Sequence, residues 1–139
     1  MTVPEHLRQA VIHRAGNRCE YCLLSQLAQE AAFHLDHVVP QSAGGPTSLD
    51  NLALACVSCS LRKGSRQTAI DAASGIEVPI FDPRRDTWHT HFRWTGAGLV
   101  GLTATGRATL EALQMNRPRV LEIREEERQR GRHPPPGHL

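Results

Sequence analysis

The chain has 139 residues, of which 40% are apolar and six are aromatic. The formal net charge is +2, which by itself is too small to indicate a nucleic-acid partner. No run approaches the roughly 18 apolar residues of a membrane span. The first residues lack the basic and apolar regions of a secretory signal. We therefore expect a cytoplasmic protein without a membrane partner.

The first half of the sequence alternates short helical and extended patterns. Apolar residues at helical spacing predict a first helix over residues 3–15, and Leu23–Ala32 has the pattern of a second, short helix. Beyond it, the sequence predicts a strand over 33–39 that ends at Pro40, an exposed loop over 41–48, a strand over 52–56 and a helix over 60–70 with Gly64 as its weak point.

The second half has a different composition. It predicts strands over 77–81 and 99–102, a helix from Thr103 or Thr105 to Met115, and a helix from Pro118 to near Gly131. The proline-rich end, residues 132–139, is typical of a disordered tail. We predict a core domain over residues 1–70, a C-terminal extension over 71–131 packed on or beside it, and the tail. Aromatic and basic residues mix over 84–94, but in a protein with so few aromatics we expect Trp88, Phe92 and Trp94 in the core.

The four cysteines form two Cys-x-x-Cys pairs, Cys19–Cys22 and Cys56–Cys59. This spacing allows a tight turn to direct two thiolates at one tetrahedral ion. Disulfides, a redox pair or four unrelated thiols are the alternatives, and the lack of an export signal disfavours disulfides. The sequence thus predicts one structural Zn²⁺ held by all four cysteines, a closed site that leaves no position for catalysis.

Between and after these pairs, the sequence reads HLDHVVPQSAGGPTSLDNLALACVSCSLRKG over residues 34–64. The ordered combination of Asp-His, Gly-Gly-Pro, Leu-Asp-Asn-Leu, the cysteine pairs and Lys-Gly resembles the HNH endonuclease family. The resemblance implies an α+β protein with a ββα-metal core. The zinc knuckle would stabilise that core, flanked by the N-terminal helix and a C-terminal strand-helix extension.

The resemblance also implies residue roles. His37 would be the general base that takes a proton from water, as suits a side chain that is largely neutral at cell pH. Asp36 would be a ligand of a divalent cation, Mg²⁺ or Mn²⁺. Asn51 would hold the loop and orient His37, although an ordinary Asp-Asn turn is the alternative reading.

One position departs from the family pattern. Where the family usually has His or Asn after the last cysteine, as a second metal ligand, this chain has Ser60. A hydroxyl is a poorer ligand for a cation, so the affinity for metal is expected to fall. His34 is a possible substitute, because period-2 geometry puts it on the same strand face as Asp36, with His37 on the other face. Alternatively, His34 is a surface residue and Ser60 only caps its helix.

Three basic residues, Arg62, Lys63 and Arg66, lie on the helix that this fold places near DNA. Contact with phosphates and a simple solvated helix face are equally compatible with them. Our leading hypothesis is a metal-dependent DNA endonuclease without a small-molecule cofactor. A zinc-stabilised nucleic-acid-binding module with a degenerate HNH site is the alternative, and a protein-interaction module is a third. The sequence does not indicate an oligomeric state.

Overall fold

The structure is a computed structural model that describes residues 3–137. It is an α+β protein of short helices and three separate two-stranded antiparallel sheets, as the sequence predicted. The chain forms two compact units. Unit 1 comprises Met1–Gln67 and Asp82–Arg85, and unit 2 comprises Thr68–Phe81 and Asp86–Leu139. We predicted two continuous segments, whereas residues 82–85 return to unit 1, where Arg84 forms an ion pair with Glu20.

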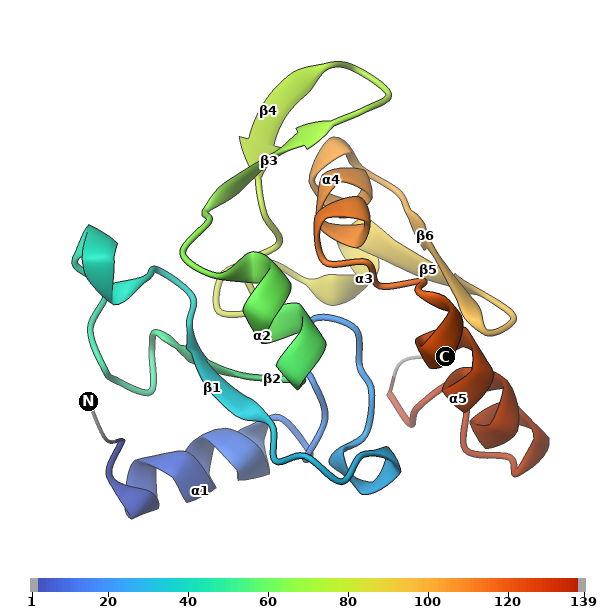
Figure 1. Cartoon of the computed structure of the whole chain (residues 1–139), viewed down its shortest axis with the longest axis horizontal. Coiled ribbons are helices and arrows are strands. Elements are labelled where there is room, and N and C mark those ends of the chain that lie inside the picture. The colour runs from blue at the N-terminus through green and yellow to red at the C-terminus, as the bar shows by residue number, and fades with distance from the viewer. Residues whose placement is uncertain (1–2, 138–139) are drawn as a thin grey trace. The chain divides into compact units, whose positions relative to one another are not determined.

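Unit 1 contains the predicted ββα arrangement. Two strands, β1 (His34–His37) and β2 (Leu52–Ala55), pair antiparallel with His34 opposite Ala55. Helix α2 (Val57–Lys63) packs against both strands, and α1 (Glu5–Arg14) contacts β2 (Figure 1). The four residues of β2 are fully buried, because β1, α1 and α2 all contact this strand.

Two predicted helices of unit 1 are wrong in part. The segment Leu23–Ala32 contains only a single 3-10 turn, Gln26–Ala28, because Leu23 takes a positive φ of 63° and Ser25 caps the turn. The helix predicted over 60–70 begins three residues earlier and ends at Lys63. Gly64 ends it by taking a φ of 53°, which few residues other than glycine adopt.

Unit 2 is built from two hairpins and three helices. The chain after α2 forms strand β3 (Thr68–Asp71), which we predicted as helix, and β3 pairs with β4 (Ile76–Pro79). The remaining elements follow in chain order: α3 (Trp88–His91), β5 (Phe92–Thr95), β6 (Gly98–Gly101), α4 (Ala104–Ala112) and α5 (Pro118–Gln129). Thr103 caps α4 as predicted, accepting the N–H of Gly106 at 2.9 Å.

Aromatic side chains form much of the core of unit 2. The Trp88 ring lies 5.2 Å from Phe92 and 5.3 Å from Trp94. Trp88 and Phe92 are buried, which confirms their predicted core placement, whereas Trp94 is only partly buried at the edge of this cluster. Helix α4 lies against β6, β3 and β4 (Figure 1). Helix α4 also approaches α3 closely: a Cβ at Gly106 would lie 2.1 Å from the carbonyl oxygen of His91 in α3, so this position requires glycine.

The segment predicted as a disordered tail makes contacts with unit 2. The His133 ring lies 4.4 Å from the Trp94 ring, and Pro135 is fully buried. The edge contact of His133 and the burial of Pro135 therefore replace the expected disorder over 132–137, while residues 138 and 139 lie outside the described residues. Within residues 3–137, no helix has the length and apolar character needed to cross a membrane.

Candidate active site and metal centre

The two Cys-x-x-Cys pairs meet in unit 1. The four sulfur atoms of Cys19, Cys22, Cys56 and Cys59 all lie within 4.8 Å of one another, and all four side chains are buried. The Sγ atoms of Cys22 and Cys56 are 3.8 Å apart. A tetrahedral Zn²⁺ with bonds of 2.3 Å needs ligands about 3.8 Å apart, whereas a disulfide needs about 2.05 Å. The four cysteines thus form a cluster that can hold a metal ion, and the Cys22–Cys56 distance matches the spacing that zinc requires.

Local backbone geometry brings each pair together. The positive φ of Leu23 turns the chain after Cys22, and the Cys19 amide donates to the Leu24 carbonyl at 2.9 Å. In the second pair, the Cys56 sulfur caps α2 by accepting the Cys59 amide at 3.4 Å. Burial raises the pKa of Cys19, while hydrogen bonds from the other three thiols lower that of Cys56. Four buried cysteines can all be deprotonated to thiolates only when a bound cation balances their negative charge.

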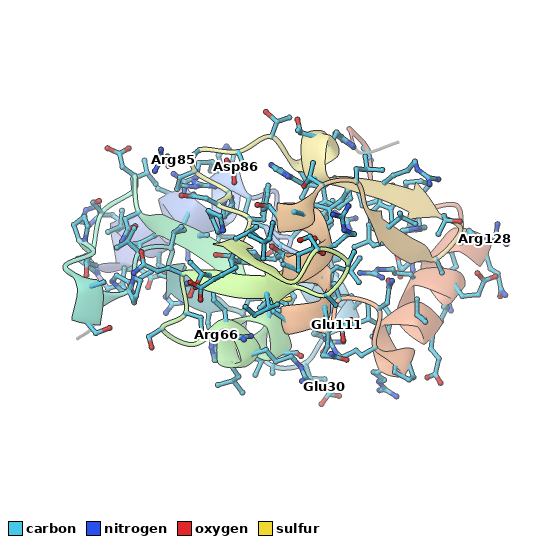
Figure 2. All side chains as sticks on the ribbon, turned by 90° about the horizontal axis from the view of Figure 1, so that it is seen from above. Glu30, Arg66, Arg85, Asp86, Glu111 and Arg128 are labelled. Atoms are coloured by element: carbon cyan, nitrogen blue, oxygen red, sulfur yellow. The ribbon has the colours of Figure 1, made fainter. Side chains whose placement is uncertain are left out.

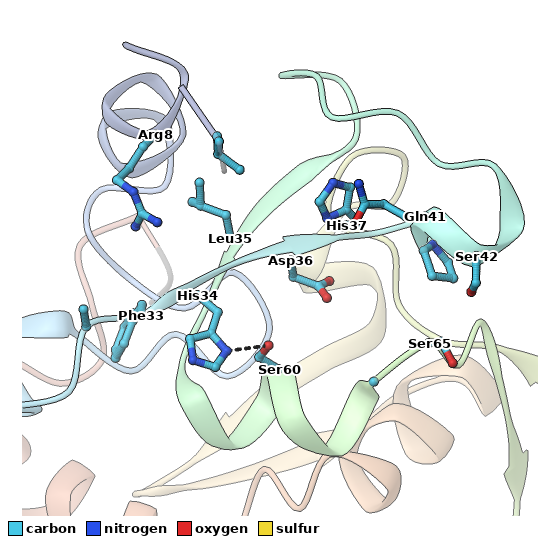
Figure 3. A pocket seen from close by; sticks show the side chains of 14 residues that line it. Arg8, Phe33, His34, Leu35, Asp36, His37, Gln41, Ser42, Ser60 and Ser65 are labelled. Atoms are coloured by element: carbon cyan, nitrogen blue, oxygen red, sulfur yellow. Dashed lines mark hydrogen bonds between the residues drawn. The ribbon is translucent and has the colours of Figure 1, made fainter. Parts of the chain in front are cut away.

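A cavity of about 710 Å³ opens beside β1 and α2. Its lining includes four of the predicted site residues: His34, Asp36, His37 and Ser60. In Figure 3, the His34 and Asp36 side chains lie on the α2 side of β1, and the His37 imidazole lies on the other side. This is the alternation that the strand pattern predicted, yet all of these residues border the same cavity.

The Asp36 carboxylate has two buried partners. The phenol of Tyr21 donates to Oδ2 at 2.8 Å, and the Lys63 ammonium lies 3.2 Å from the same oxygen. Burial raises the pKa of the Asp36 carboxyl above its ordinary value, although Lys63 and Tyr21 both oppose the shift. Since Tyr21 stands between Cys19 and Cys22, the cysteine cluster positions a group that holds Asp36.

The His37 ring is held by a residue that the sequence did not single out. Its Nε2 lies 2.9 Å from the Thr47 hydroxyl in the following loop. Threonine at this position belongs to no periodic pattern, and only its place in the Gly-Gly-Pro-Thr loop gave a signal. The ring therefore has a hydrogen-bond partner at one nitrogen, which fixes its orientation.

Asn51 joins the ends of this loop. Its side-chain oxygen accepts the Val39 amide at 3.0 Å, and its Nδ2 donates to the carbonyls of Val39 and Pro46 at 2.9 Å each. Gly45 lies against this junction, because a Cβ there would come within 1.7 Å of the Val39 carbonyl oxygen. Asn51 thus fixes the backbone on both sides of the loop that carries Thr47.

His34 and Ser60 contact each other, with His34 Nδ1 2.9 Å from the Ser60 hydroxyl (Figure 3). Ser60 lies inside α2 and cannot be its N-cap, because Cys56 has that place. A hydroxyl and an imidazole therefore line the cavity together, near the Asp36 carboxylate.

The basic residues differ in accessibility. Arg62 and Arg66 are exposed, and the Arg66 side chain extends from the ribbon in Figure 2. Lys63, expected with them at the DNA surface, is only 2% exposed because its ammonium pairs with Asp36 and donates to the His37 carbonyl at 3.1 Å. Arg8 of α1 lines the cavity, and sequence analysis missed it because an isolated helical arginine carries no motif.

Comparison with models of known protein families identifies a family for the segment that contains this site. Residues 19–66 match the HNH endonuclease family. The match covers about a third of the chain and extends from Cys19 past Lys63, so the cysteine cluster and the cavity residues of β1 and α2 fall within it. Searches of curated proteins and of solved structures found no match.

The HNH match confirms the resemblance predicted from the sequence, over that segment. HNH domains are nucleases or bind nucleic acids, and the match indicates this broad class for residues 19–66. The ββα pair-and-helix arrangement and the four-cysteine cluster agree with this assignment.

Proposed function

We propose that the protein is a DNA endonuclease that hydrolyses phosphodiester bonds with the help of a divalent cation. The observation that supports this most is that one cavity is lined by His34, Asp36, His37 and Ser60, all of which lie within the HNH segment. These side chains supply an imidazole as base, a carboxylate as anion, and a hydroxyl and a second imidazole as neutral metal ligands, all at one open cavity. Phosphodiester hydrolysis requires a base for water and a cation for the phosphate and leaving oxygen.

His37 is the proposed base. When Nε2 donates to the Thr47 hydroxyl, Nδ1 is the unprotonated nitrogen and can accept a proton from water. Asn51 acts indirectly, because it fixes the loop that carries Thr47. Both residues keep the roles that the family resemblance implied, with Thr47 as an added positioning residue.

Two cation sites are proposed. The cysteine cluster fits a structural Zn²⁺ in ligand type and in spacing. Asp36, with Ser60 and His34, fits Mg²⁺ or Mn²⁺ in the kind of donor atoms, because a carboxylate, a hydroxyl and an imidazole face one cavity. A divalent cation bound there would neutralise charge on the phosphate.

Arginines around the cavity are the proposed contacts for the DNA backbone. Arg62 and Arg66 are exposed beyond α2, and Arg8 lines the cavity from α1. Guanidinium groups bind phosphate oxygens through paired N–H donors. Binding would then be weakened by salt and largely independent of base sequence.

A DNA-binding module without catalysis is the second candidate. Ser60 in place of His or Asn, and the ion pair between Asp36 and Lys63, favour it specifically. Both features weaken the interaction of the site with a divalent cation, and neither affects the exposed arginines.

A cleavage assay separates the two candidates. Zinc-loaded protein is incubated with duplex, nicked and branched DNA, with Mg²⁺, with Mn²⁺ or with neither. We expect cleavage that His37→Ala lowers by ~10²–10⁴-fold, the usual effect of removing a general base. Zinc content and DNA binding should stay unchanged. His13→Ala, which removes an exposed histidine of α1, is the matched control.

The assay also has a clear negative result. If no DNA form is cut but salt-sensitive binding is present, the binding module replaces the nuclease. A His37→Ala variant that cuts within a few-fold of the wild type would refute the assignment of the base.

A further inference from the structure

Lys63 is the one lysine of the chain, and the structure buries it. Its ammonium lies 3.2 Å from Oδ2 and 3.4 Å from Oδ1 of Asp36, and it donates to the His37 carbonyl at 3.1 Å. One cation therefore contacts both residues of the Asp-His pair. A charged side chain is rarely this buried unless its charge is matched, and Asp36 supplies the match.

The charge at the proposed metal site is thus already balanced. Asp36 is the anionic side chain among the cavity residues, and Lys63 opposes its negative charge at contact distance. The other proposed ligands, Ser60 and His34, carry no negative charge. Mg²⁺ and Mn²⁺ bind to proteins through carboxylates and substrate phosphates, so a neutralised carboxylate leaves little to attract them.

We propose that the Lys63 ammonium competes with the divalent cation for the Asp36 carboxylate. In the free protein Lys63 occupies this carboxylate and keeps divalent cations from binding tightly. A divalent cation that binds Asp36 must move the ammonium aside. The inference deepens the proposed nuclease function, since it concerns the metal affinity of the same site.

A purely structural role for Lys63 makes different predictions. If Lys63 only joins α2 to β1, its replacement would change stability and leave the affinity for divalent cations as it was. Competition predicts instead that removal of the charge strengthens metal binding. One nearby opposite charge shifts a carboxylate's affinity for protons by ~10–1000-fold. We therefore expect Lys63→Met to bind Mn²⁺ at least tenfold more tightly than the wild type.

The test measures Mn²⁺ binding to zinc-loaded protein without DNA, by electron paramagnetic resonance of the free ion. The set comprises wild type, Lys63→Met, Lys63→Arg, Asp36→Asn and the double variant Asp36→Asn/Lys63→Met. The gain should appear in Lys63→Met, be absent from Lys63→Arg, which keeps the charge, and disappear in the double variant. Arg130→Met, an exposed charge removal in unit 2, is the matched control and should show no gain. Equal affinity in Lys63→Met and wild type would overturn the proposal.

A second measurement needs no variant and covers the case in which Lys63→Met does not fold. Because the chain has one lysine, ¹⁵N-lysine labelling gives one side-chain ammonium signal. Mg²⁺ is titrated into wild type and Asp36→Asn. Asp36-dependent Mg²⁺ binding that shifts the ammonium signal supports displacement. Asp36-dependent binding that leaves the signal unmoved would overturn it. Neither measurement involves DNA, so a protein that fails to cut DNA would still give a decisive result.

Discussion

The two units of this protein differ in the groups that stabilise each of them internally. Unit 1 carries the cysteine cluster, and of the six aromatic residues it contains only Tyr21 and Phe33. Unit 2 has the other four aromatics, which form edge and tilted contacts 5.2–5.5 Å apart. A small unit with few large side chains buries too little apolar surface to be stable alone, and a bound metal supplies the remainder.

The two units also differ in where their polar side chains lie. Unit 1 brings polar side chains to an open cavity, where Tyr21 of the first cysteine pair holds Asp36 and Thr47 of the following loop holds His37. In unit 2, by contrast, an exposed arginine covers a buried carboxylate: the Arg107 guanidinium makes two hydrogen bonds to Asp71, which is inaccessible to solvent. We therefore propose that a metal at the cysteine cluster stabilises the unit with the reactive groups, whereas packing of large side chains stabilises the other.

Removal of the metal should give the largest difference in stability between the two units. Apparent binding free energies for structural Zn²⁺ are about 10–16 kcal/mol, more than a small unit can lose. We expect a strong zinc chelator, or Cys59→Ser, to unfold unit 1 and abolish its DNA binding. Both tryptophans lie in unit 2, so near-ultraviolet circular dichroism of Trp88 and Trp94 should persist, while the signal of Tyr21 is lost. Loss of both signals together would show that the units fold as one.

The reverse experiment removes packing from unit 2. Trp88 is 6% exposed and contacts the rings of Phe92 and Trp94. Truncation of a large buried aromatic costs about 3–5 kcal/mol, so Trp88→Ala should unfold unit 2 at a much lower denaturant concentration. Zinc content, measured by elemental analysis, should remain one per chain. Thr90→Ala, on the exposed side of the same helix, is the control and should change little.

Sequence reasoning succeeded where local patterns decide the structure. The cysteine spacing, the Asp-His pair and Asn51 all predicted groups that the structure brings to unit 1. Thr103 and the proline-led start of α5 were predicted because helix caps depend on neighbouring residues alone.

The misses depend on contacts between distant residues. β3 was predicted as helix, since nothing in its own sequence shows that it pairs with β4. Lys63 was placed at the surface because charged residues usually are, and its partner Asp36 is 27 positions away. Leu23–Ala32 has apolar residues at helical spacing, but the turn at the cysteine pair sets its backbone instead.

A smaller effect should distinguish positioning from catalysis in unit 1. Thr47→Val keeps the shape of the side chain but removes the hydroxyl that lies 2.9 Å from His37. We expect cleavage to fall by about fivefold, between wild type and His37→Ala, because a neutral hydrogen bond contributes about 1 kcal/mol. Serine keeps the hydroxyl, so Thr47→Ser should restore most of the rate. A Thr47→Val protein as inactive as His37→Ala would mean that the hydroxyl takes part in the reaction itself.

The smallest expected effect concerns the acid sensitivity of unit 2. Hydrogen bonds from Arg107 and Ser74 hold the pKa of Asp71 well below its ordinary value of 3.8. A carboxyl whose pKa is lower in the folded state contributes stability that is present above its unfolded pKa and is lost as pH falls through the folded pKa. Asp71→Asn should therefore lower the melting temperature of unit 2 at pH 7, followed by tryptophan circular dichroism. Below pH 4 the melting temperatures of variant and wild type should converge. Glu77→Gln removes an exposed carboxylate of the same hairpin and is the control. A difference that stays constant down to pH 2 would show that shape, and not the charge of Asp71, stabilises this hairpin.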